Sequence, residues 1–165
     1  MKTIPNKKLT DNFWLYEFIE ANLPPEGIKM NWDNIDQFSE KEALKMAEFL
    51  QKIRELINIV FRDKNGNQEI GIRITSGWRC KEWELFRNRS GKSQHVICAA
   101  DIQPTNCSNE LAVEIIKYLY HVFSPRETGH KGGFAIKEPT YKDGQIVAVG
   151  FAHFDLRKSV ARWEY

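Results

Sequence analysis

The amino-acid sequence predicts an α+β fold in which helices pack on one side of a small antiparallel sheet. Two patterns carry this prediction. Apolar residues recur at threes and fours between positions 43 and 60, as in an amphipathic helix, and they alternate with polar ones at 70–74 and 151–156, as in strands. A chain of 165 residues can bury one substantial core. We find no repeat or linker, so a single domain over residues 1–165 is expected.

The first half of the chain predicts one long helix and one strand, with loops around them. Residues 9–19 form a short apolar element, and residues 26–38 after Pro24-Pro25 are expected to be a loop. Ser39 and Glu42 form a capping box that opens a helix of about twenty residues. Asn65-Gly66 predicts a turn, and a half-buried strand follows at 70–74. Residues 80–92 are expected to be irregular or loosely helical.

The second half predicts strands separated by one helix. A strand is expected at 96–102, and Ser108 or Asn109 caps a helix that carries Leu111, Ile115 and Leu119 on one face. Asp143-Gly144 joins two further segments, 134–136 and 145–149. The last strand, 151–156, completes the sheet.

This last strand has two different faces. Side chains alternate along a strand, so Ala152, Phe154 and Leu156 share one face and suit a core. His153, Asp155 and Arg157 share the other, which indicates the floor of a polar site. A solvated strand face is the alternative interpretation.

Composition excludes several classes of function. The net charge is +2, from 24 basic and 22 acidic residues, so no basic face for nucleic acid is expected. The basic segment 1–8 is followed by no apolar stretch, which predicts no signal peptide, no membrane insertion and synthesis in the cytoplasm. Three cysteines without a CxxC pair predict free thiols. Nothing indicates an oligomeric state.

His95, Asp101 and His153 are candidate metal ligands. Two histidines and one carboxylate are usual protein ligands of a hydrolytic zinc site, in which a fourth position stays open for water. Histidines near acids on a solvated surface are the alternative.

Five segments resemble a known family when they are taken in order. They are 9–18 (LTDNFWLYEF), 74–79 (ITSGWR), 93–102 (SQHVICAADI), 151–157 (FAHFDLR) and 161–163 (ARW). The order is similar to that of the zinc peptidases that cut peptidoglycan stem peptides. These include D-Ala-D-Ala carboxypeptidases and phage L-alanyl-D-glutamate endopeptidases, and they share a fold with the hedgehog signalling domain. The resemblance covers about 150 residues of the chain.

The resemblance implies a function and roles for particular residues. His95, Asp101 and His153 would bind Zn²⁺, and Arg79 would hold the developing oxyanion or a substrate carboxylate. Ser93, Gln94 and Trp78 would contact the substrate, a peptidoglycan stem peptide; packing in the core is the alternative for Trp78. The chain would then be a phage lysis enzyme released to the cell wall, or a virion part. Carboxypeptidase and endopeptidase activity both remain open.

The sequence departs from the family pattern at two places. His95 and Asp101 are six residues apart, where the family has seven with a glycine between them, so the chain must bend without glycine; Cys98 could offer a thiolate instead. Several relatives place an acid three residues before the last histidine, where this chain has Gly150. Asp155 would then be the general base, or it would orient His153 or pair with Arg157. These departures also support an alternative function, an inactive structural or cell-wall-binding module.

Overall fold

The structure is a computed structural model that describes residues 6–126 and 130–165. It confirms an α+β fold with a small sheet and helices. The chain divides into two compact units, Met1–Gln51 with Ile74–Ala100 and Lys52–Arg73 with Asp101–Tyr165. The expected single domain stays a prediction. No helix in the described part of the chain is long and apolar enough to cross a membrane.

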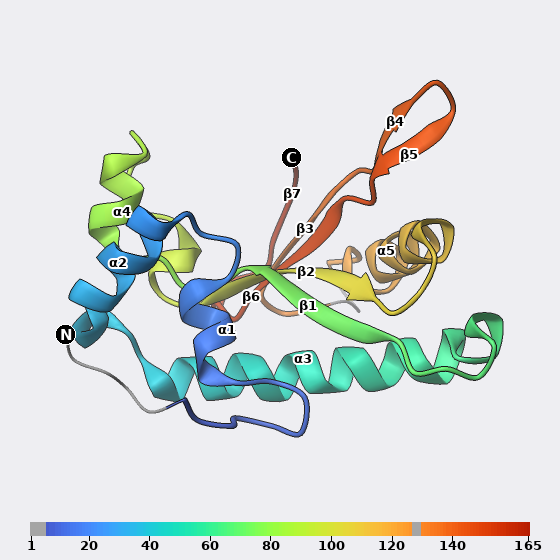
Figure 1. The fold of residues 1–165 in the computed structure, drawn as a ribbon, viewed down its shortest axis with the longest axis horizontal. Helices are drawn as coiled ribbons and strands as arrows, with labels where there is room; N and C mark the ends of the chain where they lie inside the picture. The colour runs from blue at the N-terminus through green and yellow to red at the C-terminus, as the bar shows by residue number, and fades with distance from the viewer. Residues whose placement is uncertain (1–5, 127–129) are drawn as a thin grey trace. The chain divides into compact units, whose positions relative to one another are not determined.

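Three short helices lie together in the first unit (Figure 1): α1 (Leu15–Glu20), α2 (Pro25–Asp33) and α4 (Lys81–Phe86). The prediction of a loop over 26–38 is wrong for α2. Pro25 stands in the first turn, where a helix needs no N–H donor and the fixed φ of proline suits the backbone. Helix α2 packs closely on α4 at Gly27, where a Cβ atom would lie only 3.1 Å from the ring of Trp83.

The long helix is confirmed as α3 (Glu40–Phe61). Ser39 caps it, since its Oγ accepts a hydrogen bond of 3.3 Å from the backbone N–H of Glu42. Two 3₁₀ turns flank it, η1 (Ile35–Gln37) and η2 (Asp63–Asn65). Gly66 and Asn67 then adopt positive φ and form the turn that the Asn-Gly pair predicts.

Five strands form the main sheet in the order β1 (Gly71–Ser76), β2 (Ala99–Thr105), β6 (Phe151–Asp155), β3 (Gly133–Lys137) and β7 (Ala161–Glu164). The sheet is mixed, which corrects the antiparallel prediction. β3 pairs antiparallel with β6 and parallel with β7. The chain reverses after β6, so β7 runs opposite to β6. β3 also runs opposite to β6. β3 and β7 therefore run in the same direction, and they pair as parallel strands.

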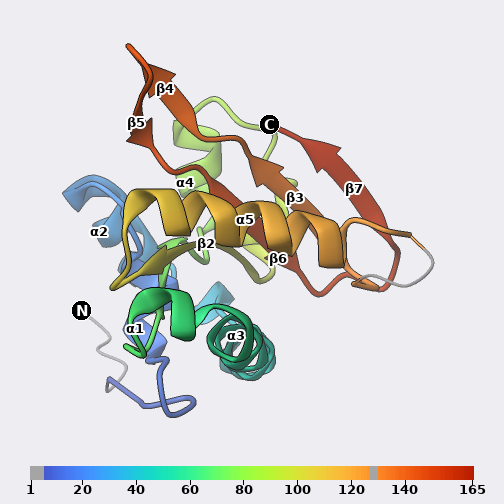
Figure 2. The same ribbon diagram turned by 90° about the vertical axis from the view of Figure 1, so that its right-hand side faces the viewer.

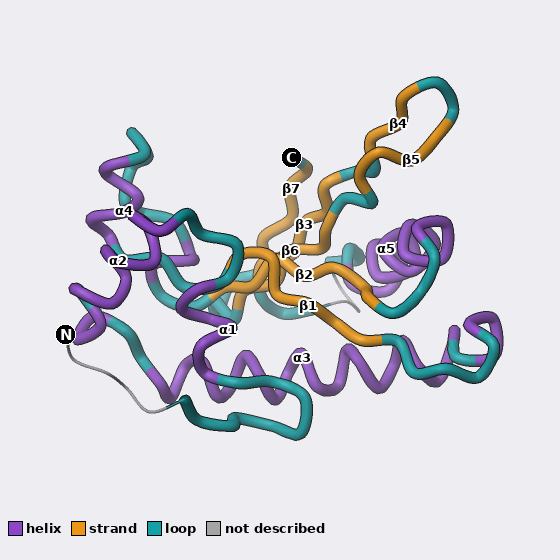
Figure 3. The backbone as a smooth tube through the Cα atoms, in the orientation of Figure 1, coloured by secondary structure: helices purple, strands orange, loops and turns teal. Residues whose placement is uncertain are grey.

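In the second unit, helix α5 (Asn109–Phe123) packs on β3 and β6 (Figure 2). Phe123 at its end contacts the rings of Phe134 and Phe154 at centroid distances of 6.0 and 5.3 Å. Phe154 is fully buried on this face, as the alternation predicts, and His153 and Asp155 therefore lie on the opposite face of β6. A separate hairpin, β4 (Thr140–Lys142) and β5 (Gln145–Ala148), projects from this unit (Figure 3).

Candidate metal centre

His95 lies in the first unit, in the 3₁₀ turn η3 (Gln94–Val96), and only 3% of its surface is exposed. Its Nδ1 is 2.6 Å from the carbonyl oxygen of Gly77. A carbonyl can only accept a hydrogen bond, so Nδ1 carries the proton and Nε2 carries the lone pair. A histidine in this tautomer is prepared to bind a cation through Nε2.

A buried asparagine holds the loop that carries this carbonyl group. The side chain of Asn31 is fully buried; it donates to the carbonyl of Trp78 at 3.0 Å and accepts from the backbone N–H of Cys80 at 2.9 Å. Between them, the backbone N–H of Arg79 donates to the carbonyl of His95 at 3.0 Å. The loop and the histidine are thus fixed to each other through the main chain as well as through the imidazole ring.

The bend after His95 forms without glycine. Ser93 caps η3, because its Oγ accepts a hydrogen bond of 3.2 Å from the backbone N–H of His95. Ile97 ends the turn at φ −93° and ψ −76°, and β2 begins at Ala99. Cys98 between them is buried, and burial raises the pKa of its thiol to about 12. A thiol with this pKa is protonated at neutral pH, which favours packing over metal binding for Cys98.

Arg79 is held by a buried acid. Its Nε lies 2.9 Å from Oε1 of Glu84, an ion pair outside hydrogen-bonding angles, and the same oxygen accepts a hydrogen bond of 3.1 Å from Arg89. Only 1% of Glu84 is exposed. Sequence reasoning missed Glu84 because it falls in the segment expected to be irregular; the spacing of charges around α4 was the one available signal.

The residues expected to bind substrate have different surroundings. Trp78 is 1% exposed and donates from Nε1 to the carbonyl of Val96 at 3.0 Å, which favours the packing alternative. Ser93 caps η3 and also accepts a long hydrogen bond of 3.4 Å from Arg79. Gln94 is partly exposed in the same turn. Their contacts with a substrate stay a prediction.

Asp101 and His153 form a pair in the second unit. Oδ1 of Asp101 lies 2.6 Å from Nδ1 of His153, and both residues are buried. The hydroxyl group of Tyr165 is 3.3 Å from the same nitrogen. Burial works to lower the pKa of His153, but the hydrogen bonds and charges of Asp101 and Asp155 outweigh it, and the pKa is raised.

Asp155 supports His153 from the other side of its ring. Its Oδ2 is 3.4 Å from Nε2 of His153, and its carboxylate also accepts from the backbone N–H of Gly133 at 3.0 Å. Arg157 donates to it from Nε at 2.8 Å and from its backbone N–H at 3.1 Å. Burial works to raise the pKa of Asp155, but His153 and Arg157 lower it well below its usual range. This arrangement favours the orienting and pairing roles over that of a general base, which takes up a proton near neutral pH.

The three predicted ligands lie together. His95, Asp101 and His153 are buried, each offers one ligand atom, and these atoms are within 4.8 Å of one another. Ligand atoms about 2 Å from one zinc ion lie within roughly 4 Å of each other. Cys98 is not part of this group. The donor set therefore fits a borderline-soft divalent cation such as Zn²⁺.

Gly150 has a steric reason to be glycine. Its φ is +79°, and a Cβ atom there would lie 2.1 Å from the carbonyl oxygen of Lys137. A side chain at position 150 would thus be strained and would collide with the neighbouring backbone. An acidic side chain at position 150 therefore does not fit this backbone.

Comparison of the chain with models of protein families, with curated proteins and with solved structures finds no match.

Proposed function

We propose that the protein is a zinc-dependent peptidase with a hedgehog-like fold that hydrolyses an amide bond in peptidoglycan stem peptides. The proposal joins the family resemblance of the sequence to a buried group of two histidines and one carboxylate. The resemblance supplies the substrate class, and the buried group supplies a place for the metal.

The hydrogen-bond acceptors that orient the two histidine rings carry the proposal. The carbonyl of Gly77 orients His95, and the carboxylate of Asp155 orients His153. A carbonyl or carboxylate on the second ring nitrogen is typical of histidines that bind metals.

Each residue has a proposed role. A bound zinc ion would supply a Lewis acid that lowers the pKa of water to near 7 and polarises a carbonyl group. His95, Asp101 and His153 would hold the ion, and Asp155 would keep His153 in the required tautomer. Arg79 would bind a carboxylate or a developing oxyanion, with Glu84 fixing its guanidinium group.

One observation favours a second candidate, a metal-binding module without hydrolytic activity. Position 150 cannot carry an acid, and Asp155 is engaged by Arg157. A site without a group to take the proton from water would bind metal and cell wall but would hydrolyse slowly.

Zinc content per chain, measured by elemental analysis, tests the metal first. We expect one zinc in the wild-type protein, none in His153→Ala, and one in His121→Ala, which removes an exposed histidine on α5. Absence of zinc from the wild type, even after zinc is added back, would overturn both candidates.

Digestion of purified peptidoglycan then separates the two candidates. A peptidase releases new amino and carboxyl termini in a zinc-dependent manner, and Arg79→Lys should lower that rate more than it lowers zinc content. Binding to sedimented peptidoglycan without release of termini would refute the peptidase and support the binding module.

A further inference from the structure

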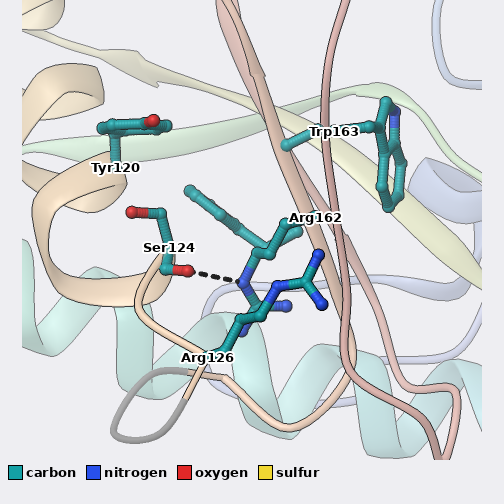
Figure 4. Close-up of a pocket in the computed structure, with 7 residues that line it drawn as sticks. Tyr120, Ser124, Arg126, Arg162 and Trp163 are labelled. Carbon is teal, nitrogen blue, oxygen red and sulfur yellow. Dashed lines mark hydrogen bonds between the residues drawn. The ribbon is translucent and has the colours of Figure 1, made fainter.

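A pocket lies in the second unit, between the end of α5 and strands β3 and β7. It has a volume of about 390 Å³, within the usual range for small-molecule sites. Tyr120, Ser124 and Arg126 line it from the end of α5 and the segment that follows (Figure 4). Strands β3 and β7 provide the other side. The pocket therefore sits on the face of the sheet that α5 covers.

Aromatic and aliphatic side chains form part of the wall of this pocket, whose surface is about equally polar and apolar. Phe134 and Ala135 of β3 line it and are each 1% exposed. Tyr120 is 37% exposed and lines the wall from α5. Tyr120 offers apolar surface that a ligand can cover at a gain in free energy, whereas Phe134 and Ala135 are already buried.

Arg162 contributes a fixed positive charge. Its guanidinium group donates to the carbonyl of Ser124 at 3.0 Å, of Gly132 at 2.7 Å and of Ala161 at 2.8 Å, and it also donates to the carbonyl of His130. These backbone acceptors hold the group in place without neutralising its charge. Burial, followed by the charge of Arg126, lowers the pKa of Arg162.

Two arginines give this pocket its positive charge. Arg126 and Arg162 both line it, and none of its lining residues in the described part of the chain is acidic. The charge of Asp155 raises the pKa of Arg162 and so offsets part of the effect of Arg126, but this carboxylate is fully buried and is paired with Arg157. Two like charges in one hollow repel each other, and an anion between them would relieve that repulsion.

We propose that this pocket binds a small organic carboxylate, with its apolar body against Tyr120 and its carboxylate on Arg126. Arg162 contributes positive charge, but most of its N–H groups already donate to backbone carbonyls. Arg126 therefore makes the direct contact with the carboxylate. Its fork of N–H groups matches a carboxylate. None of the predicted metal ligands lines this pocket. Trp163 also lines the pocket from β7, but its ring points away from the other lining residues (Figure 4) and contacts His153.

The test uses benzoate and ¹⁵N-labelled, chelator-treated protein, so that no metal can bind the probe. Benzoate should shift the backbone amide signals of Ser124, Ala135 and Arg162 and should saturate below about 20 mM. Benzamide, which has the same shape without charge, and inorganic phosphate, which has charge without an apolar body, should each bind at least about fivefold more weakly.

A variant pair assigns the contact. Arg126→Gln should weaken benzoate binding by about fivefold or more, whereas Lys142→Gln on the exposed hairpin removes the same charge and should leave it unchanged. Arg126 is exposed, so the variant should fold, and unchanged amide signals far from the pocket would verify this. No saturable shifts, shifts centred elsewhere, equal binding of phosphate, or equal loss in both variants would each overturn the proposal.

Discussion

The support that Asp155 gives to His153 can be tested by Asp155→Asn, which keeps the shape of the side chain and removes its charge. The contact between Oδ2 and Nε2 is long, at 3.4 Å. Loss of such a supporting group costs 10–100-fold in metal affinity, and the long contact places our expectation near the lower limit, about tenfold or about 1.4 kcal/mol. Competition with a chromophoric zinc chelator measures this change directly.

The same substitution should also destabilise the metal-free protein. An amide nitrogen in place of Oδ2 would face Nε and Nη2 of Arg157, which now donate to that oxygen at 3.0 and 2.5 Å. Breaking a buried ion pair costs about 3–5 kcal/mol, but the side chain of Arg157 is 28% exposed and water can compensate part of the loss. We expect about 1–2 kcal/mol by urea unfolding.

Asp143→Asn is the matched control, because it removes the same charge from an exposed turn. It should change neither zinc affinity nor stability by a measurable amount. Zinc affinity of Asp155→Asn within about twofold of the wild type would refute the orienting role of Asp155. Equal losses in both variants would instead indicate a general effect of net charge.

Three further predictions concern the fold and its dependence on pH. Glu84→Ala should lower the free energy of unfolding by about 2–3 kcal/mol, because it leaves the guanidinium groups of two arginines without their acid. Glu48→Ala, on the exposed face of α3, should change it by less than about 0.5 kcal/mol. Equal losses for the two variants in urea titration would contradict the ion-pair argument. Gly150→Ala should destabilise the protein by at least about 1 kcal/mol more than Gly144→Ala in thermal unfolding. Both glycines have positive φ, but only a Cβ atom at Gly150 would meet a neighbouring backbone. Equal losses of stability would exclude that close approach. The raised pKa of His153 stabilises the metal-free protein at acidic pH, and this contribution is lost as pH rises through the folded-state pKa. The free energy of unfolding should therefore depend less on pH in His153→Gln than in the wild type. An unchanged pH profile would refute this contribution of His153.

Local periodicity predicted much of the fold. Apolar residues spaced by three or four positions after Ser39 predicted α3. Alternation of apolar and polar residues along 151–156 correctly placed Phe154 in the core. The parallel pairing of β7 could not be predicted, because it depends on which strand the tail pairs with rather than on its own pattern. The sequence did not predict helix α2, because a proline pair usually interrupts a helix, whereas here its second member opens one.

The candidate centre was predictable only as a set of residue types. Spacing and residue type singled out His95, Asp101 and His153, which lie together, but gave no sign of the groups that orient the two rings. The acceptor for His95 is a backbone carbonyl group, which carries no residue-type signal at all. The glycine at position 150 was visible, yet its steric cause involves a carbonyl group thirteen positions away in the chain.

The two histidines also differ in how evolution can alter their support. Asp155, which orients His153, can be removed by a single codon change, so that contact is open to tuning and to loss. The carbonyl of Gly77 persists whatever residue is encoded there, and a Cβ atom at this position would instead meet the backbone of Phe18 at 2.4 Å. A saturation mutagenesis map would therefore show position 77 as intolerant for steric reasons and would leave its hydrogen bond to His95 invisible. Backbone ester substitution at Trp78 would weaken this carbonyl as an acceptor, and it would also remove the Trp78 N–H that donates to the carbonyl of Phe18 at 2.6 Å, so chemical synthesis would alter both contacts together.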